Sequence, residues 1–464
     1  MSALRAGRGA ARAAVRAAVT AALLISGAAG PVRAQELSAV SGTLPSGVVY
    51  ELRADPAQAA AAVALWYRAP AAGFDGPPLP GLSRLAATTV AGSTPVTGTP
   101  LGRLIGGFGG RLAVAAYPDS VSITALVPPD RVAQTVRAMT ADYFAPVVTA
   151  DGLRLAGREA AAELQLRSYE PEAIEDALGQ ALFAAGPLHD GVFGRPDALA
   201  GVTLEQVRAY AERAFRPANA ILVLTGNVDR AALREVAARP DAGPPSPEPP
   251  AGQIARPAGP PLSRAGNVAG IGLGWIGPPI ADEAAATALD FTADALFGGR
   301  TSVVPKALGE RKASVSGKFL TFRAPGVFLV TITGSEAAAA RPLVEKAIAD
   351  AAKPMPQPAF DAARARFVYR LLSQMETPAD LSDVYGWYTV EGAPAYAPGD
   401  GGTGGRYFTL AVQLTPASVA AAVAEYLGGP PAVVTLARPQ PKPSPSLRPS
   451  PKPSPSPRPG KTPA

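Results

Sequence analysis

The stretch Gly81-Leu-Ser-Arg-Leu-Ala-Ala-Thr-Thr-Val-Ala-Gly-Ser-Thr94 is the part of the chain from which its fold can be worked out. We expect it to form a helix. Two predicted strands, Val48 to Leu52 and Ala61 to Tyr67, precede it. The segment between the second strand and the helix, Gly73 to Pro80, is dense in glycine and proline, so it is predicted to be a loop. The first half of the chain therefore opens with strands that lead into a helix.

Further elements follow this helix at short intervals. Leu112 to Ala116 and Ser120 to Val127 predict a hairpin that turns at Tyr117-Pro118-Asp119. Thr203-Leu-Glu-Gln206 is a capping box, whose N-cap is worth about 1 kcal/mol, so a helix is expected to begin there. The other predicted elements of this half are helices over Leu101 to Phe108, Asp130 to Tyr143, Asp151 to Gln165 and Pro171 to Phe183, and a buried strand over Ile221 to Leu224.

Residues 239–261 are rich in proline and glycine, and this composition predicts a linker rather than a packed element. Beyond the linker, the order of strands and helices repeats, which predicts a duplicated domain. Two of the three tryptophans, Trp66 and Trp275, lie near the ends of corresponding strands, where we expect them to pack at the edge of a core. The predicted elements of the second half are strands over Gly270 to Ile276, Gly326 to Thr333 and Ala432 to Leu436, and helices over Asp282 to Phe297, Ala337 to Ala351, Pro358 to Gln374, Pro378 to Val390 and Pro416 to Leu427.

The net charge of +6 for the 464 residues comes from the two ends of the chain. Eleven Lys and Arg lie in residues 1–34 and 438–464, which contain no acidic residue, so the remaining body has 32 basic and 37 acidic groups. A mildly acidic body disfavours a nucleic-acid partner, because phosphate binding needs a basic face on the folded part. The chain has no cysteine, which excludes disulfides and thiolate chemistry.

Each end of the chain has a distinct composition. Residues 1–34 combine arginines, an apolar run from Ala17 to Gly27 and the small-residue pattern Val32-Arg33-Ala34, which predicts a signal peptide and an exported protein, periplasmic or in the cell envelope. An uncleaved anchor is disfavoured because the run is shorter than the roughly 20 residues that span a bilayer. No transmembrane segment is expected after cleavage. The Lys/Arg-Pro-Ser tail, residues 438–464, is predicted to be disordered, either as a solvated tail or as a basic tether.

Several short motifs in a fixed order resemble the insulinase and pitrilysin family of zinc metallopeptidases, which includes the mitochondrial processing peptidase. They run from Leu44-Pro-Ser-Gly47 to about Leu436. The others are Gly81-Leu82, Gly109-Gly110, Pro187-Leu188, Gly194, Phe215-Arg-Pro-Ala-Asn219, Gly226-Asn-Val-Asp229 and Leu296 to Ser302. The resemblance implies an α+β fold of two tandem homologous domains, residues 35–238 and 262–437, each a mostly antiparallel sheet with helices on one face.

The family's catalytic motif, His-x-x-Glu-His, falls on the opening stretch and is replaced there. By the resemblance, Arg84 stands at the first His, Ala87 at the Glu and Thr88 at the second His, while Glu163 keeps the position of the third zinc ligand. A hydrolytic zinc site needs about three protein ligands. The only histidine of the chain is His189, in a predicted loop, where we expect it to face solvent. We therefore expect no catalytic residue, no zinc and no other cofactor, and Glu163 to be a surface or ion-pair residue.

Further family positions are also changed. Non-catalytic subunits of the family grip substrate with an Arg and a Tyr, which correspond here to Gly309 and Ser316, although Arg311 and Lys312 keep the segment basic. The family's Asn in the substrate-binding strand corresponds to Ala113. The backbone of that strand does not depend on side chains, so it is still predicted to be an exposed edge that binds extended peptide. The strand consists of Leu112, Ala113, Val114, Ala115 and Ala116.

The resemblance and these losses together predict an exported peptidase homologue that has lost its chemistry. The main hypothesis is a non-catalytic partner subunit of a separate zinc peptidase, in a heterodimer with a catalytic insulinase-family subunit or in a homodimer, which helps to enclose a peptide. The alternative is a structural or scaffolding subunit of a cell-envelope assembly. A third hypothesis is a weak metalloendopeptidase with a non-standard site.

Overall fold

The computed structural model describes residues 38–74, 78–94, 98–236, 254–255, 259–323, 325–394 and 405–438. The predicted signal peptide, nearly all of the tail and most of the predicted linker lie outside these residues. Residues 38–464 form one unit by their contacts. The domain boundaries therefore stay predictions.

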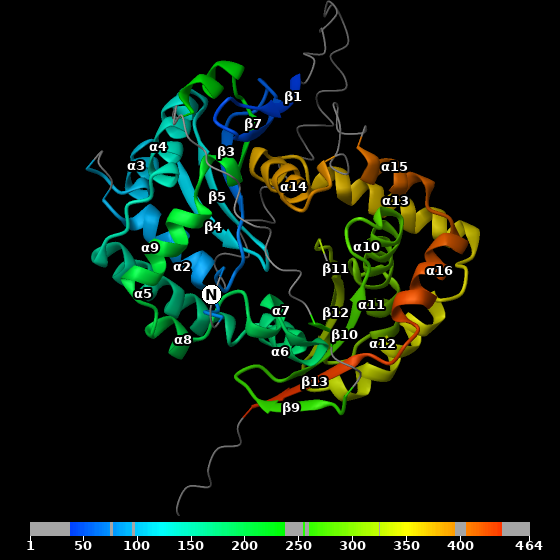
Figure 1. Cartoon of the computed structure of the whole chain (residues 1–464). Coiled ribbons are helices and arrows are strands. Elements are labelled where there is room, and N and C mark those ends of the chain that lie inside the picture. Colours follow the sequence, from blue (N-terminus) through cyan, green and yellow to red (C-terminus); the bar gives the residue numbers. More distant parts are fainter. Residues whose placement is uncertain are drawn as a thin grey trace, which may run out of the picture. The chain divides into compact units, whose positions relative to one another are not determined.

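A sheet of six strands organises the first half (Figure 1). Its central strand is β3 (Ala61–Arg68), which is paired antiparallel to both neighbours. Only β2 and β7 run parallel to each other. Across the sheet, the strands are β1 (Ser38–Thr43), β2 (Val49–Ala54), β7 (Ala220–Gly226), β3, β5 (Ser120–Val127) and β4 (Arg111–Ala116).

The second half contains a sheet of five strands with a similar arrangement around a central strand. Its central strand, β10 (Gly270–Gly277), also has antiparallel neighbours on both sides, and only β13 and β9 run parallel. Across the sheet, the strands are β11 (Ser314–Leu320), β12 (Gly326–Thr333), β10, β13 (Ala432–Ala437) and β9 (Leu262–Ala265). A short ladder also joins β6 (Phe183–Ala185) to β8 (Ile254–Ala255).

The helices follow the same order in both halves. Those of the first half are α2 (Leu82–Gly92), α3 (Leu101–Gly107), α4 (Val132–Phe144), α5 (Ala150–Arg167), α6 (Glu172–Leu182), α7 (Pro187–Asp190), α8 (Pro196–Ala200) and α9 (Leu204–Ala214). Those of the second half are α10 (Glu283–Phe297), α11 (Val303–Leu308), α12 (Ala337–Ala351), α13 (Gln357–Ser373), α14 (Pro378–Val390), α15 (Arg406–Gln413) and α16 (Pro416–Leu427). The predicted repeat is therefore visible in the described elements. The strands and α-helices that were not predicted from the sequence are β1, β6, β8, β9, β11, α7, α8, α11 and α15, and β8 lies within the predicted linker.

Each sheet packs one face against helices of its own half. In β3, Val63, Leu65 and Tyr67 enter a core that is closed by α2, α4 and α9. In the second half, Leu273 and Trp275 of β10 enter a core with α10, α12, α13 and α16. The alternation of residues along each strand sends the intervening side chains to the opposite face.

A helix from the other half covers that opposite face. Helix α14 packs on β3 and β7 of the first sheet, where Trp66 meets Tyr385 and Val390 in a small core. Helix α6 packs on β10 and β13 of the second sheet through Ile174 and Leu178. The two halves therefore exchange one helix each, and both large sheets are covered on both faces.

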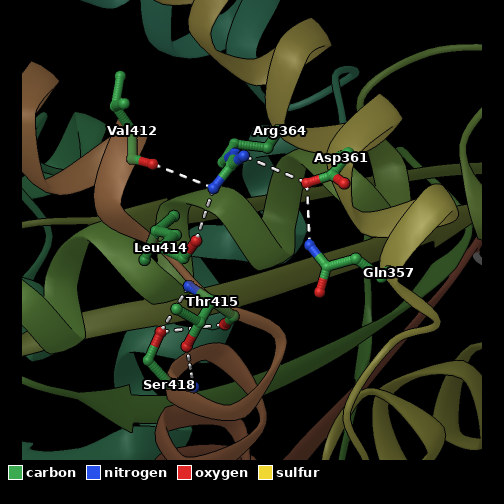
Figure 2. Close-up of polar contacts among 7 residues, drawn as sticks. All are labelled: Gln357, Asp361, Arg364, Val412, Leu414, Thr415 and Ser418. Carbon is green, nitrogen blue, oxygen red and sulfur yellow. Dashed lines mark hydrogen bonds and ion pairs between the residues drawn. The ribbon is translucent and has the colours of Figure 1, made fainter.

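Polar contacts join α13 to the segment between α15 and α16, as Figure 2 shows. Arg364 donates to the carbonyl oxygens of Val412 at 3.1 Å and Leu414 at 3.0 Å, and so satisfies acceptors at the end of α15. Helix α16 then begins at a capping box formed by Thr415 and Ser418. Helix α9 begins in the same way, because both bonds of the predicted Thr203–Gln206 capping box are present.

Within the described ranges, no single helix is long and apolar enough to cross a membrane. Only α15 and α16 taken together, with a bend of 105° between them, pass a test of length and composition.

Candidate functional site

The crossing of α2 and α5 brings together two of the positions that the sequence singled out. The guanidinium of Arg84 on α2 forms an ion pair with the carboxylate of Glu163 on α5. The side chain of Arg84 is 19% exposed and that of Glu163 is 40% exposed, so the pair lies at the rim of the helix layer. The positions assigned to the first and third metal ligands are thus in direct contact, but one of them carries a permanent cation.

The other two positions of the motif cannot supply the missing groups. Ala87 is fully buried in the first core, and its carbonyl oxygen accepts a hydrogen bond of 2.8 Å from the hydroxyl of Tyr143. Thr88 is partly exposed, one helical turn after Arg84 and on the same face of α2. A buried alanine therefore stands at the position of the general base, and a threonine hydroxyl stands at the position of the second histidine.

At the end of the α2–α5 crossing that lies away from the Arg84–Glu163 pair, small residues set the distance between the two helices. A Cβ on Gly152 of α5 would lie 2.9 Å from the carbonyl oxygen of Thr89 on α2, so glycine permits the close approach. The hydroxyl of Ser93, directly after α2, accepts a 3.0 Å hydrogen bond from the backbone N–H of Thr149. The two helices are thus held at one end by close packing and at the other by the Arg84–Glu163 pair.

These residues do not fit a zinc ion. Zinc binds neutral imidazole, thiolate or carboxylate ligands, and an arginine at the first ligand position offers only donors and a positive charge. Among the described residues, no group of three or more His, Asp or Glu side chains is placed to hold a metal. His189 lies on the short helix α7, where a loop was expected, and its Nδ1 is 2.9 Å from Asp190 Oδ1. The expected absence of zinc remains a prediction for measurement.

The strand predicted to bind peptide is β4, and it lies at the edge of the first sheet (Figure 1). Its residues Leu112 to Ala116 pair with β5 on one side only. Leu112 and Val114 are partly buried against the first core, whereas Ala113 is exposed. In the second sheet, the equivalent strand β11 is also an edge strand. Each sheet therefore presents one edge made by the first strand of a hairpin.

A cavity of about 580 Å³ lies beside the ends of these two edge strands. The first half contributes Trp66 and Tyr117, and the second half contributes Lys318 of β11 and Trp387 of α14. The rings of Tyr117 and Trp387 meet edge to face with centroids 4.7 Å apart, so aromatic contacts join the two halves at the cavity wall. The volume is in the range that holds a few side chains of a bound ligand.

The charged groups of this cavity are largely paired. Arg167 donates two hydrogen bonds of 2.8 Å to Asp176, and Lys318 lies 2.8 Å from Glu175. Asp383 also lines the cavity, and surrounding protein raises the pKa of its carboxyl to about 6. Sequence reasoning missed these lining residues, because α6, β11 and α14 meet here only through the exchange of helices.

Neither of the two positions assigned to substrate gripping, Gly309 and Ser316, lines this cavity. Gly309 ends α11 with a φ of 58°, a backbone conformation that favours glycine over the arginine of the family pattern. Ser316 is exposed on the edge strand β11. The local backbone thus gives a physical reason why an arginine is absent at position 309.

Comparison with known proteins agrees with this architecture. Residues 201–367, which reach from the end of the first half to α13, match the family described as the peptidase M16 inactive domain. The fold is similar to that of a protease from Helicobacter pylori, with a TM-score of 0.74 and 16% identity over 87% of this chain and 100% of that one. No curated protein matches the sequence.

Two further solved structures have the same fold. One is a peptidase M16 inactive domain from Pseudomonas fluorescens, with a TM-score of 0.72 and 19% identity over 87% of this chain and 98% of that one. The other is a chain of Complex III2 from Candida albicans, with a TM-score of 0.71 and 11% identity over 86% of this chain and 96% of that one. At these identities, the structures establish the fold alone.

These matches confirm the predicted resemblance and the predicted fold class. The chain has the fold of M16-like peptidases, with two α+β halves, and its residues 201–367 match the peptidase M16 inactive domain. Because the matched segment lies after the α2–α5 crossing, the argument against catalysis rests on Arg84, Ala87 and Thr88 themselves. Such a chain fits a non-catalytic role.

Proposed function

We propose that this protein is an exported, non-catalytic partner of a separate zinc peptidase subunit and that it holds extended peptide beside that subunit. The observation that carries the proposal is the Arg84–Glu163 ion pair. It engages the one remaining carboxylate ligand and places a guanidinium where a metal ion would be repelled. The contact keeps the α2–α5 crossing together without metal, so the fold remains available for binding.

Peptide binding is supported by the open edge of β4 and the cavity next to it. An edge strand offers unpaired N–H and C=O groups, to which an extended peptide can add as a further strand. Because Ala116 and Tyr117 line the cavity, a peptide on this edge would reach the cavity with its next side chains. Neither feature requires the residues that were lost.

A partner subunit is supported by the M16-like fold and by the similarity to a chain of Complex III2, which is a multi-subunit assembly. The partner would be a catalytic insulinase-family subunit or a second copy of this chain. Export is supported by the composition of residues 1–34. The alternative is a scaffolding role in the cell envelope, and the peptide-binding test below distinguishes it from the partner role.

The first test concerns metal and catalysis. Purified wild-type protein should contain no stoichiometric zinc by elemental analysis and should leave a fluorogenic, unstructured peptide uncut. The double variant Arg84→His/Thr88→His should instead bind zinc, because two imidazoles one turn apart would join Glu163 as ligands. Chelator-sensitive turnover by the wild type would contradict the proposal, and failure of a folded double variant to bind zinc would show that these positions do not form the former site.

The second test concerns the edge strand. Adjacent residues of β4 alternate in the direction of their N–H groups. Because the N–H of Tyr117 bonds to Ser120, the N–H of Ala115 points to β5 and that of Val114 to the open edge. Val114→Pro therefore removes a donor on the open edge, whereas Ala115→Pro breaks a bond to β5. The open-edge variant should weaken binding of a fluorescein-labelled, unstructured peptide about tenfold while keeping its melting temperature.

Glu163→Ala is the matched control for peptide affinity, which it should not change. Equal affinity of all folded variants for the peptide would show that the edge of β4 does not bind it. Absence of peptide binding by the wild type would favour the scaffolding role.

A further inference from the structure

A pair of carboxyl groups lies where the first half meets the end of α14. Asp119 lies in the turn between β4 and β5, and Glu391 directly follows α14. Glu391 is 2% exposed, so its carboxyl group is removed from water. The two acids come from distant parts of the sequence, and each is fixed by a different half of the chain.

The hydrogen bonds around the pair leave one buried oxygen of each carboxyl group without a donor among the described residues. Glu391 Oε2 accepts a 2.8 Å hydrogen bond from the backbone N–H of Arg323. Asp119 Oδ1 and Glu391 Oε1 are buried, and no donor among the described residues reaches them. The two carboxyl groups lie within hydrogen-bonding reach of each other, and a hydrogen bond between them requires a shared proton.

The charged groups that face the pair are Arg68 at the end of β3 and Arg323 in the loop after β11. Arg68 Nε donates to the carbonyl oxygen of Val390 at 3.0 Å, and Arg323 Nη2 donates to the same oxygen at 3.2 Å. These bonds hold the C-terminal end of α14, where a cation is favourable. Arg323 lowers the pKa of both carboxyl groups and Arg68 that of Asp119, but burial raises both pKa values by more.

Burial, reinforced by the neighbouring Asp119, raises the pKa of Glu391 to about 9. Burial also raises the pKa of Asp119. Near neutral pH Glu391 therefore keeps its proton. Loss of that proton would place two adjacent negative charges in a buried site between the halves.

We propose that Asp119 and Glu391 form a proton-sharing latch that fixes the tip of the β4–β5 hairpin to the end of α14 and releases it when the shared proton is lost. The neighbouring residues Tyr117 and Pro118 line the cavity, and β4 runs directly into this turn. Release would therefore loosen the wall of the cavity at the end of the edge strand. The latch does not depend on the proposed binding of peptide.

The direction of the pH effect follows from proton linkage. Unfolded glutamate has a pKa of about 4.3, so between that value and about 9 the folded protein holds one more proton than the unfolded chain. Stability from the latch is therefore present at low pH and is lost as the pH rises through this window. For one extra proton, the unfolding equilibrium constant rises up to tenfold per pH unit.

Urea unfolding between pH 6.5 and 9.5 measures this slope. Glu391→Gln keeps the size of the side chain and supplies an N–H donor to Asp119 without a titrating proton. The wild type should lose stability faster than this variant, with a difference of nearly tenfold in the unfolding constant per pH unit up to about pH 9. Asp119→Asn should flatten the slope in the same way and serves if Glu391→Gln does not fold.

Glu345→Gln on α12 is the matched control, because Glu345 forms only a half-exposed pair with Arg341. It should retain the wild-type slope. Hydrogen exchange, corrected for the intrinsic rate, locates the effect: between pH 7 and 9.5 the wild type should lose protection in residues 116–122 and 388–394, and Glu391→Gln should not. Equal slopes in the wild type and both latch variants would overturn the proposal, and so would loss of protection elsewhere but not at these segments.

Discussion

The two exchanged helices cover their sheets in opposite ways. On the first sheet, the large side chain belongs to the strand: Trp66 of β3 lies against Gly386 of α14, where an added Cβ would be 2.0 Å from the indole nitrogen. On the second sheet, the large side chains belong to the helix. Ile174, Leu178 and Leu182 of α6 lie on Gly270, Gly272 and Gly274 of β10.

This difference shows how one architecture tolerates two inverse packings. What both interfaces share is a large side chain opposite a glycine, so the space between helix and sheet is filled in each. What differs is rigidity, because an indole ring held in a core cannot move aside, whereas the ends of Leu and Ile side chains change rotamer. The first interface should therefore be far less tolerant of added volume than the second.

The largest effect is expected from Gly386→Ala. The new methyl group would overlap the buried ring of Trp66, and overpacking of this kind costs about 3 kcal/mol, more than the helix gains from replacing glycine. Urea unfolding followed by circular dichroism measures the loss of free energy.

Gly272→Ala is the matched change in the second sheet. Its Cβ would meet the Cγ2 methyl of Ile174 at 2.7 Å and the Cδ1 methyl of Leu178 at 2.8 Å, and these aliphatic side chains shift more easily than a buried indole ring. We expect a loss of about 1 kcal/mol. If Gly272→Ala costs as much as Gly386→Ala, rigidity of the opposing side chain does not explain the difference between the interfaces.

A second contrast concerns the ion pairs on the helices that follow the two central strands. Arg84 of α2 pairs with a Glu163 that is 40% exposed, whereas Asp294 of α10 pairs with Arg370 of α13 and is only 3% exposed. Arg370→Ala leaves a buried carboxylate without its partner and should cost about 2 kcal/mol. Arg84→Ala should cost at most about 1 kcal/mol, because the exposed partner regains water. The reverse ranking in urea unfolding would contradict the role assigned to burial.

The repeat of elements could be predicted from the sequence, but the faces of its strands could not. The pattern Gly270-Ile-Gly-Leu-Gly-Trp275 predicts a strand, and nothing in it indicates that the glycines leave room for a helix from the other half. Trp66 and Trp275 were expected to pack at the edge of a core, near the ends of corresponding strands. In the structure, Trp66 faces the exchanged helix α14, whereas Trp275 faces the core of its own half. A shift of one residue along a strand reverses the face, so the sequence alone did not indicate which face each ring takes.

For the candidate site, sequence comparison located positions but not contacts. The assignment of Arg84 and Glu163 to two ligand positions required only motif spacing, and the structure places their side chains together. The Asp119–Glu391 pair had no such signal, because the two acids meet only through the packing of α14 on the first sheet. Long-range pairs of this kind depend on tertiary packing and are not encoded in a local pattern.

A third contrast concerns the last helix before the closing strand in each half. Helices α9 and α16 both begin at a capping box, and at α16 the preceding carbonyl oxygens of Val412 and Leu414 also accept hydrogen bonds from Arg364 (Figure 2). Arg364→Met should therefore cost about 1 kcal/mol in urea unfolding, since two acceptors lose their donor.

Arg366→Met is the matched control for this change. Among the described residues, the guanidinium of Arg366 bonds only within α13, to the Ala362 carbonyl, so its loss should change stability by less than about 0.5 kcal/mol. Equal losses for the two variants would mean that the bridge to α15 does not stabilise α16.

The smallest effect is expected where the two halves end. After β7, the short 3-10 helix Arg230–Glu235 continues the first half and buries Ala232 in its core. After β13, the composition of residues 438–464 supplies almost no apolar side chain that could take this place. Truncation after Ala437 should therefore move the melting temperature by no more than about 2 °C. Truncation after Arg438 keeps the 3.1 Å hydrogen bond from its Nε to the Asn267 carbonyl and separates that contact from the tail. A larger drop in both variants would mean that the tail packs on the second half as the 3-10 helix does on the first, and the contrast between the two ends would disappear.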